Sequence, residues 1–550
     1  MMSKFFQRKS VVFVIMIFVT VMIYVAPAAA ALKAAPLNPD FVKWREARET
    51  AANAKALSAT QKSNYGYAPS PVNWSHLKGV VYSVAPDSMG RKSASATLPV
   101  SYDLRTSMPP VRNQYPFGNC WTYAAMAATE FNLIGKRLAS SSDIDLSEWY
   151  LTYFVYNDES SLKPGFTNSS GKAYYDTGGN DWKAVALLSR GTGSVSGLKV
   201  ETPVRSEDVY APNVMEREWK LKNALYLGNL SANREEVQIA AKRIQLVKET
   251  IMAYGAVSVG IYWDNDAVNN EKFAYYSGNY HYQTNHAVTI VGWDDEYPSN
   301  NFKEGNRPKE NGAWLVRNSW GARWGDEGYF YVSYEEGTLC DGVAYDTVSA
   351  PDDEKIYQYD PLGLVAFFGQ EGKNEVYFAN IFTAGAYEAV NSVAFYTTAP
   401  DQPCEIKIYT GCDGSPVSGK LAKTAAVTLK APGYNTVELD APVKVVKGER
   451  FSVVVKTSSG LTDNLIPVEC LLPGYSDKAT AEQGQSWVSF DGKNFEDTMV
   501  SAAKAKANVC VKAFATATPA PAASSGGGCS AGFAALALLA LVPIILKKRS

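Results

Sequence analysis

Histidine is scarce in this chain of 550 residues, which contains only three. They are His76, His281 and His286. Since imidazole is the usual proton acceptor near neutral pH, chemistry that needs such an acceptor has few candidates here. We expect neither a metal ion nor a cofactor.

Cysteine is also sparse, and the seven cysteines do not form an even set. Setting aside Cys120, a candidate reactive thiol, and Cys529 in the tail leaves five, which excludes a complete disulfide framework. If the segment between Cys404 and Cys412 is a straight strand, the two lie roughly 26 Å apart, far beyond disulfide reach. We therefore expect these two cysteines not to pair with each other.

The chain has no excess of charge of either sign, with 53 Lys and Arg against 55 Asp and Glu. Near-neutrality gives no reason to expect nucleic acid or an anionic surface as a partner. The length favours roughly three folded units rather than one.

Long apolar runs occur only near the two ends. Residues 1–31 carry basic residues, the apolar run Val11–Val25 and a small-residue end, which is typical of a secretory signal peptide. An N-terminal membrane anchor is the alternative, although the run is short for a span. Either interpretation predicts an exported protein.

The C-terminal end has three parts. Residues 516–530 form a linker rich in Ala, Pro, Ser and Gly, and residues 531–550 read as a hydrophobic helix with a basic end. The apolar part, Ala531–Leu546, is short for a permanent span. We favour a sorting tail that is later removed, and a simple anchor is the alternative. Both predict membrane contact, at least transiently.

Residues 32–97 are too polar to build a core of their own. They contain a short amphipathic segment, Asp40–Leu57, and an aromatic strip with two prolines, Tyr65–Gly79, which favours an extended course over another surface. We interpret this region as a pro-segment.

The central region, 98–350, mixes helical and strand patterns and predicts an α+β unit. The expected helices are Cys120–Leu138, Trp182–Ser189 and Glu235–Tyr254. The expected strands are Ala256–Tyr262, Ala287–Trp293, Ala313–Asn318 and Gly328–Tyr334. Residues 351–515 lose the helical period and show short strand patterns separated by turns, which predicts an all-β sandwich or jelly roll.

The stretch V-R-N-Q-Y-P-F-G-N-C-W ends at Cys120 and Trp121, where a helix is expected to begin. Unpaired N–H groups and the helix dipole at that point stabilise a thiolate and lower its pKa. Gln114 lies on the preceding loop, so its carboxamide and the Cys120 N–H predict an oxyanion hole.

The proton acceptor for such a thiol is expected to be His286, which immediately precedes a predicted strand that can hold it. His76 lies in the pro-segment and His281 in a Tyr-rich approach. Asn318, at the end of the strand 313–317, is placed to orient the imidazole, and Trp320 to shield that hydrogen bond from water.

Three blocks, N-Q-x4-N-C-W, N-H-A-V-x-I-V-G-W and N-S-W-G-x-x-W-G-x-x-G-Y-F, resemble the papain family of cysteine peptidases. The resemblance covers 98 to about 334 and implies a two-lobed fold. It implies that Cys120 is the nucleophile, His286 the acid and base, Asn318 the orienting residue and Gln114 the oxyanion donor.

The sequence departs from the family near the site. Tyr115-Pro116-Phe117 replace the usual Gly-x-Cys, and Asp176-Thr177-Gly178-Gly179 lacks the usual Cys, so both halves of a disulfide are absent. Gly178 and Gly179 remain able to bind an extended peptide in β fashion. The resemblance also implies that Val257 and Ala287 line a substrate pocket. The long spacing between blocks predicts extra loops at about 205–235 and 295–311.

These features predict a secreted or surface-exposed cysteine endopeptidase made as a zymogen, acting on protein or peptide substrates. The β region resembles the lectin-like domain of some bacterial members, which makes a glycan a possible second partner. One alternative is an inactive surface adhesin on a peptidase scaffold. Another is transpeptidation, in which an amine attacks the acyl-enzyme.

Overall fold

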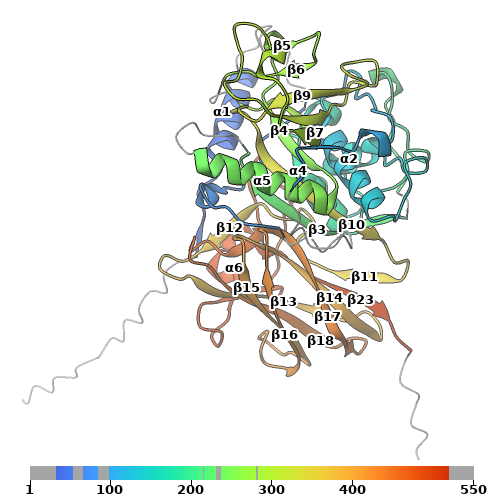
Figure 1. Cartoon of the computed structure of the whole chain (residues 1–550). Helices are drawn as coiled ribbons and strands as arrows, with labels where there is room; N and C mark the ends of the chain where they lie inside the picture. Colours follow the sequence, from blue (N-terminus) through green and yellow to red (C-terminus); the bar gives the residue numbers. More distant parts are fainter. Residues whose placement is uncertain are drawn as a thin grey trace, which may run out of the picture.

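The structure is a computed structural model that describes residues 32–53, 66–84, 98–214, 216–230, 237–279 and 283–519. The expected signal peptide, His281 and the expected apolar tail at 531–550 lie outside these residues. Within the described ranges, no helix has both the length and the hydropathy needed to cross a membrane. Figure 1 shows an upper part with most of the helices and a lower part made of strands.

The helices of the upper part begin at residues whose side chains or positions favour a helix start. The expected helix at Cys120 is confirmed as α2 (Cys120–Gly135). Helix α4 (Asp181–Ser189) begins after Asn180, whose side chain accepts from the Lys183 N–H. The unexpected helix α3 (Glu148–Tyr156) is capped in the same way by Ser147. Helix α5 (Val237–Tyr254) lies in the same part.

The second half of the peptidase region is a twisted antiparallel sheet. Its successive strands are β10 (Cys340–Ser349), β4 (Val257–Ile261), β7 (His286–Asp294), β8 (Ala313–Arg317) and β9 (Tyr329–Ser333). Short strands β6 (Ala274–Tyr275) and β5 (Val268–Asn269) extend one edge, and β2 (Ser101–Asp103) pairs with β7. Alternate residues of β4, β7 and β8 face a core of their own, distinct from the core around α2.

The C-terminal region is a β-sandwich, as expected. One layer has six strands: β16 (Lys420–Leu429), β15 (Gln402–Thr410), β18 (Arg450–Ser458), β13 (Glu375–Thr383), β20 (Ser486–Ser489) and β21 (Glu496–Asp497). The opposing layer contains β11 (Glu354–Tyr357), β23 (Val511–Ala517), β14 (Glu388–Thr397) and β17 (Gly433–Val445). Strand β23 enters the expected linker by two residues.

The two parts share one sheet, which the sequence patterns did not predict. Strand β3 (Trp219–Gly228) pairs with β10 on one side and with β17 of the sandwich on the other. The prediction of a loop at about 205–235 is therefore wrong for β3. At the junction Gly433 has φ of +126°, and an added Cβ would lie 2.1 Å from the Ala224 carbonyl oxygen. Only glycine allows this backbone approach.

A small third sheet ties the N-terminal region to the sandwich. Strand β1 (Lys33–Ala34) pairs with β12 (Ala366–Gly369), which continues through β19 (Ile466–Glu469) to β22 (Asn508–Val509). Helix α1 (Pro39–Asn53) follows β1, and its Phe41 ring packs edge-on against Tyr475 of the sandwich. The segment 66–84 then passes between the two parts, where Trp74 is buried against rings from both.

Candidate active site

Cys120 is the first residue of α2 and is completely buried. Asn119 stands at the N-cap position, but its side chain donates to the Thr152 hydroxyl, 3.0 Å away, instead of capping the helix. The Ala287 N–H donates to the Cys120 sulfur at 3.2 Å. A backbone N–H group of β7, rather than a side-chain cap of α2, therefore contacts the thiol.

The pKa of the thiol differs from the sequence-based expectation. Burial raises the pKa of Cys120 above its ordinary value, and the N–H groups of Ala287, Trp121 and Cys120 lower it by a smaller amount. The thiol is consequently neutral while the segment 66–84 covers it. The expected lowering was wrong for this covered state because desolvation outweighs the helix terminus.

His286 begins β7, one residue before the Ala287 N–H that contacts the sulfur, and is also completely buried. Its Nε2 lies 2.8 Å from the Asn318 Oδ1. The indole of Trp320 stacks on the imidazole, with ring centroids 5.0 Å apart and planes 19° apart. Burial lowers the pKa of His286 to about 4, against the Asn318 hydrogen bond, which raises it.

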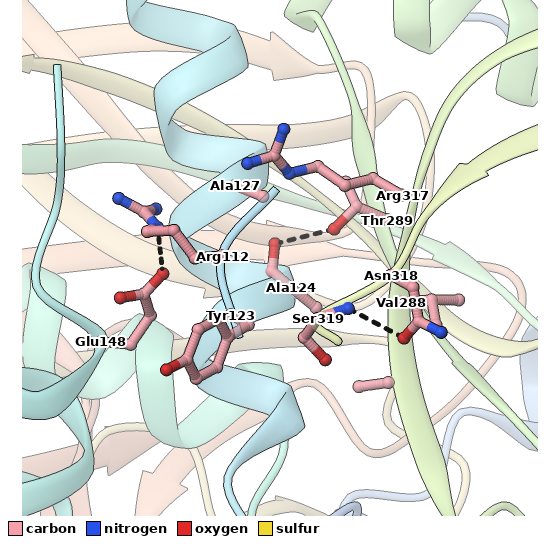
Figure 2. A pocket seen from close by; sticks show the side chains of 11 residues that line it. Arg112, Tyr123, Ala124, Ala127, Glu148, Val288, Thr289, Arg317, Asn318 and Ser319 are labelled. Atoms are coloured by element: carbon pink, nitrogen blue, oxygen red, sulfur yellow. Dashed lines mark hydrogen bonds and ion pairs between the residues drawn. The ribbon is translucent and has the colours of Figure 1, made fainter. Parts of the chain in front are cut away.

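Asn318 is itself held in one orientation. Its Oδ1 accepts from the Ser319 N–H at 2.8 Å, a bond drawn as a dashed line in Figure 2. The Ser319 bond fixes the amide flip, so Oδ1 acts as an acceptor and the His286 Nε2 facing it carries the proton and donates. The other ring nitrogen, Nδ1, lies on the side of the imidazole that faces away from Asn318.

Gln114 is buried beside the same strand end. Its backbone N–H donates to the Ser319 carbonyl at 2.8 Å, and the Ser319 hydroxyl donates to its Oε1 at 2.7 Å. Its Nε2 donates to the Phe117 carbonyl at 2.7 Å. Ser319 thus determines that the amide nitrogen, rather than the oxygen, points toward the loop that leads to Cys120.

The Gly178–Gly179 pair lies on the other side of Cys120 and is already occupied by the N-terminal region. The Gly179 N–H donates to the Gly66 carbonyl at 2.9 Å, and the Ala68 N–H donates to the Gly179 carbonyl at 2.8 Å. A Cβ on Gly179 would lie 2.4 Å from the Trp121 ring. Glycine is therefore required here, and it leaves a backbone edge that binds an extended chain.

The two segments that lack the family's disulfide are joined in another way. The Gly118 N–H donates to the Asp176 carboxylate at 2.9 Å, and the Phe117 ring packs edge-on against Tyr175 at 5.2 Å. All six described cysteines, including Cys404 and Cys412, are free. A carboxylate and an aromatic contact thus connect the Cys120 loop to the Gly178–Gly179 segment without a covalent bond.

The sequence-predicted pocket residues fall into two groups. Ala287 lies beside the Cys120 sulfur, whereas Val257 packs with Val259 and Ile261 in the core of the sheet. Alternation along β4 places Gly260 on the opposite face, where an added Cβ would lie 3.0 Å from the Tyr67 ring. The structure does not bring Val257 to the cleft.

The sequence patterns did not predict several residues near the site. Beneath it, Arg112 forms ion pairs with Glu130 and Glu148, both at 2.7 Å, and with Asp145. Figure 2 shows Arg112 and Glu148 paired beside α2. Nothing in the residue pattern marks these partners, because they come together only when α2 and α3 pack.

No group of three or more His, Cys, Asp or Glu among the described residues is arranged to hold a metal ion. The expectation of no metal and no cofactor remains a prediction.

Comparison with known proteins assigns this arrangement to a family. Residues 98–350 match the model of the papain family cysteine proteases, and residues 356–515 match that of a lectin like domain. Residues 98–350 therefore form a papain-like domain. Cysteine proteinase 2 of Entamoeba histolytica is 28% identical over 251 residues, which are 45% of this chain and 67% of that protein. Cathepsin J of Rattus norvegicus is 28% identical over 276 residues, 48% of this chain and 68% of its own.

Solved structures extend the similarity to both domains of this chain. The cysteine protease and lectin-like domains of Cwp84, a surface layer associated protein of Clostridium difficile, superpose with a TM-score of 0.70 at 23% identity, covering 89% of this chain and 99% of that one. A second structure of Cwp84, solved after propeptide cleavage, gives 0.64 at 24% identity, covering 76% and 99%. The chain is thus a papain-like cysteine peptidase followed by an all-β lectin-like domain.

Proposed function

We propose that this protein is an exported cysteine endopeptidase in which Cys120 attacks the peptide carbonyl. The observation that carries the proposal is the convergence of Cys120 at a helix start, the Ala287 N–H on its sulfur, and the His286–Asn318 pair at 2.8 Å. In the uncovered enzyme the imidazole of His286 takes the thiol proton, and the thiolate forms a covalent acyl bond to the substrate.

The remaining roles follow from the same geometry. Gln114, whose amide nitrogen is turned toward the Cys120 loop, and the Cys120 N–H supply two donors for the oxyanion. His286 then returns its proton to the leaving amine, and Asn318 keeps the imidazole oriented during both transfers. Water attacks the acyl-enzyme and completes hydrolysis. Transpeptidation would differ only in this last step, with an amine in place of water.

We further propose that residues 32–97 form a pro-segment that holds the enzyme inactive. The described part of this region pairs with Gly179, and a Cβ on Gly66 would lie 2.2 Å from the Gly118 carbonyl oxygen. No space remains there for a second chain. Residues 98–350 would be the mature peptidase domain and 351–515 the lectin-like domain.

Export rests on the sequence pattern of residues 1–31 and on the description of Cwp84 as a surface layer associated protein. We propose that residues 516–530 are a linker and that residues 531–550 are a sorting tail or anchor. N-terminal sequencing of the active form is expected to begin near Leu98. A mature form that retains Trp44 would contradict the pro-segment proposal.

The catalytic proposal is tested by labelling the processed protein with an epoxide-type thiol-protease inhibitor, followed by peptide mass spectrometry. We expect one adduct, on Cys120, and none in Cys120→Ala. The matched control is Cys412→Ala, which removes a buried thiol of the lectin-like domain and should keep the adduct. A processed wild type that stays unlabelled would instead support the alternative, an inactive adhesin.

A glycan remains a possible second partner of residues 351–515, motivated by the lectin-like family match. The proposal is tested on a glycan array with the processed full-length Cys120→Ala protein, because the lectin-like domain shares a sheet with the peptidase and is not shown to fold alone. Absence of any bound glycan would remove it.

A further inference from the structure

The side chain of Tyr67 enters a pocket beside the Cys120 site. Tyr67 bridges to Gly179 and is buried to 1% exposure. Its hydroxyl donates to the Asp341 Oδ2 at 2.5 Å and lies 3.8 Å from the Cys340 sulfur. Gly260 forms a wall where any side chain would touch the Tyr67 ring. The pocket is therefore long enough for a phenol and ends at a carboxylate.

Asp341 is an unusual residue for the end of such a pocket. Its Oδ1 accepts from the Tyr226 hydroxyl at 3.0 Å, so both carboxylate oxygens are bonded to phenols. Among the described residues, no Lys or Arg forms an ion pair with it. Its backbone has φ of +52°, in the left-handed region that non-glycine residues rarely adopt. A partly buried carboxylate without a cation depends on its hydrogen-bond donors, because an unmet acceptor in a closed pocket is costly.

Removal of the pro-segment takes one of these two donors away. Tyr67 leaves with the segment, while Tyr226 stays on β3 and Asp341 on β10. The Oδ2 then faces a pocket that the next chain bound along Gly179 will fill with its own side chain. A side chain of the same length with a donor at its tip restores the lost bond, whereas an apolar one leaves the carboxylate unmet.

We infer that Asp341 is a specificity-determining residue: it selects substrates whose side chain, at the position paired with Gly179, is long and ends in a hydrogen-bond donor. The phenol of tyrosine and the cations of arginine and lysine meet this description, and phenylalanine does not. This inference rests on the proposed peptidase activity and names the substrate class of that same site. The pro-segment would thus carry, in Tyr67, an imitation of the preferred side chain.

The test compares two peptides that differ only in tyrosine against phenylalanine at that position, cleaved by the processed enzyme. A carboxylate left without a donor in the filled pocket predicts a kcat/KM about tenfold to a hundredfold higher for the tyrosine peptide. Equal kcat/KM values would overturn the inference and leave the peptidase proposal intact. Failure to cleave either peptide, together with no inhibitor adduct on Cys120, would overturn the peptidase proposal, on which the inference depends.

Three substitutions test whether Asp341 discriminates between the tyrosine and phenylalanine peptides. Asp341→Ala removes the acceptor, so the tyrosine-to-phenylalanine ratio should fall toward one. Asp266→Asn, which changes an exposed carboxylate elsewhere in the peptidase, should keep the wild-type ratio. Tyr226→Phe leaves the substrate as the remaining phenolic donor to Asp341, so the ratio should not fall. A wild-type ratio in Asp341→Ala would contradict the assignment, and the wild-type comparison stands even if a variant does not fold.

Discussion

The two sides of the active site are supported by different cores. Cys120 sits on α2, whose buried face belongs to a core that runs on into the lectin-like domain, including Phe395 and Phe514. His286 and Asn318 sit on β7 and at the end of β8, whose core is confined almost entirely to the peptidase sheet. The nucleophile therefore depends on the appended domain for its support, and the acid–base pair largely does not.

Truncation after residue 350 should have the largest effect. It removes β17 from the edge of β3 and uncovers Trp182, Tyr226 and the rest of the shared core. The free energy that burial of this surface contributes far exceeds the net stability of a domain. We therefore expect loss of cooperative unfolding and of Cys120 labelling. Circular dichroism and the inhibitor adduct measure this. Truncation after residue 519, which keeps the lectin-like domain, is the control. A fully active 98–350 fragment would contradict the proposed dependence of the Cys120 side on that domain.

A smaller effect is expected from breaking a buried ion pair in the lectin-like domain. Lys512 and Asp360 lie 2.9 Å apart, and both side chains are at most 1% exposed. Lys512→Met leaves an unpaired buried carboxylate, which costs about 3–5 kcal/mol in the free energy of unfolding. Denaturant unfolding should show this loss, with Cys120 labelling lost in the same transition. The double variant Lys512→Met with Asp360→Leu should recover most of it.

On the side of the site that the peptidase sheet supports, Asn318→Ala should reduce activity with little loss of stability. Without the Oδ1 acceptor the imidazole loses its orientation, so kcat should fall roughly tenfold to a hundredfold, less than the roughly 10²–10⁴-fold of a whole acid–base group. Asn318→Asp keeps an acceptor and should retain more activity. An unchanged kcat in Asn318→Ala would contradict the orienting role.

The smallest effect concerns Lys183, buried near the Gly178–Gly179 segment between the rings of Tyr156, Phe166 and Tyr475. Burial, assisted by Arg48 of α1, lowers the pKa of Lys183 to about 7. Between pH 7 and the ordinary lysine value the unfolded chain binds more protons, so stability of the proenzyme should rise with pH in that window. Thermal unfolding of Lys183→Met should show a flatter rise, and Lys447→Met, an exposed control, should follow the wild type.

The sequence anticipated which residues meet at the candidate site better than it anticipated what surrounds them. The blocks around Cys120, His286 and Asn318 carry their chemistry in residue type and spacing, so the structure could be anticipated there. Asp341 and Arg112 gave no such signal, because their roles arise only when distant strands and helices meet. Strand β3 was placed in an extra loop because the spacing between the family's blocks is longer than expected there, and its pairing partner β17 lies about 200 residues away along the chain.

The backbone pairing at Gly433 also bears on how such proteins can be recombined. A domain joined by a tether can be exchanged by cutting the tether, but this one is joined through main-chain hydrogen bonds and a position where only glycine fits. A foreign β-sandwich grafted after residue 350 would need a strand of matching register with glycine at one defined place. The unit that can be moved between proteins is therefore the whole of 98–515, and a chimera cut at 350 should require Gly433 and its flanking strand to be carried with it.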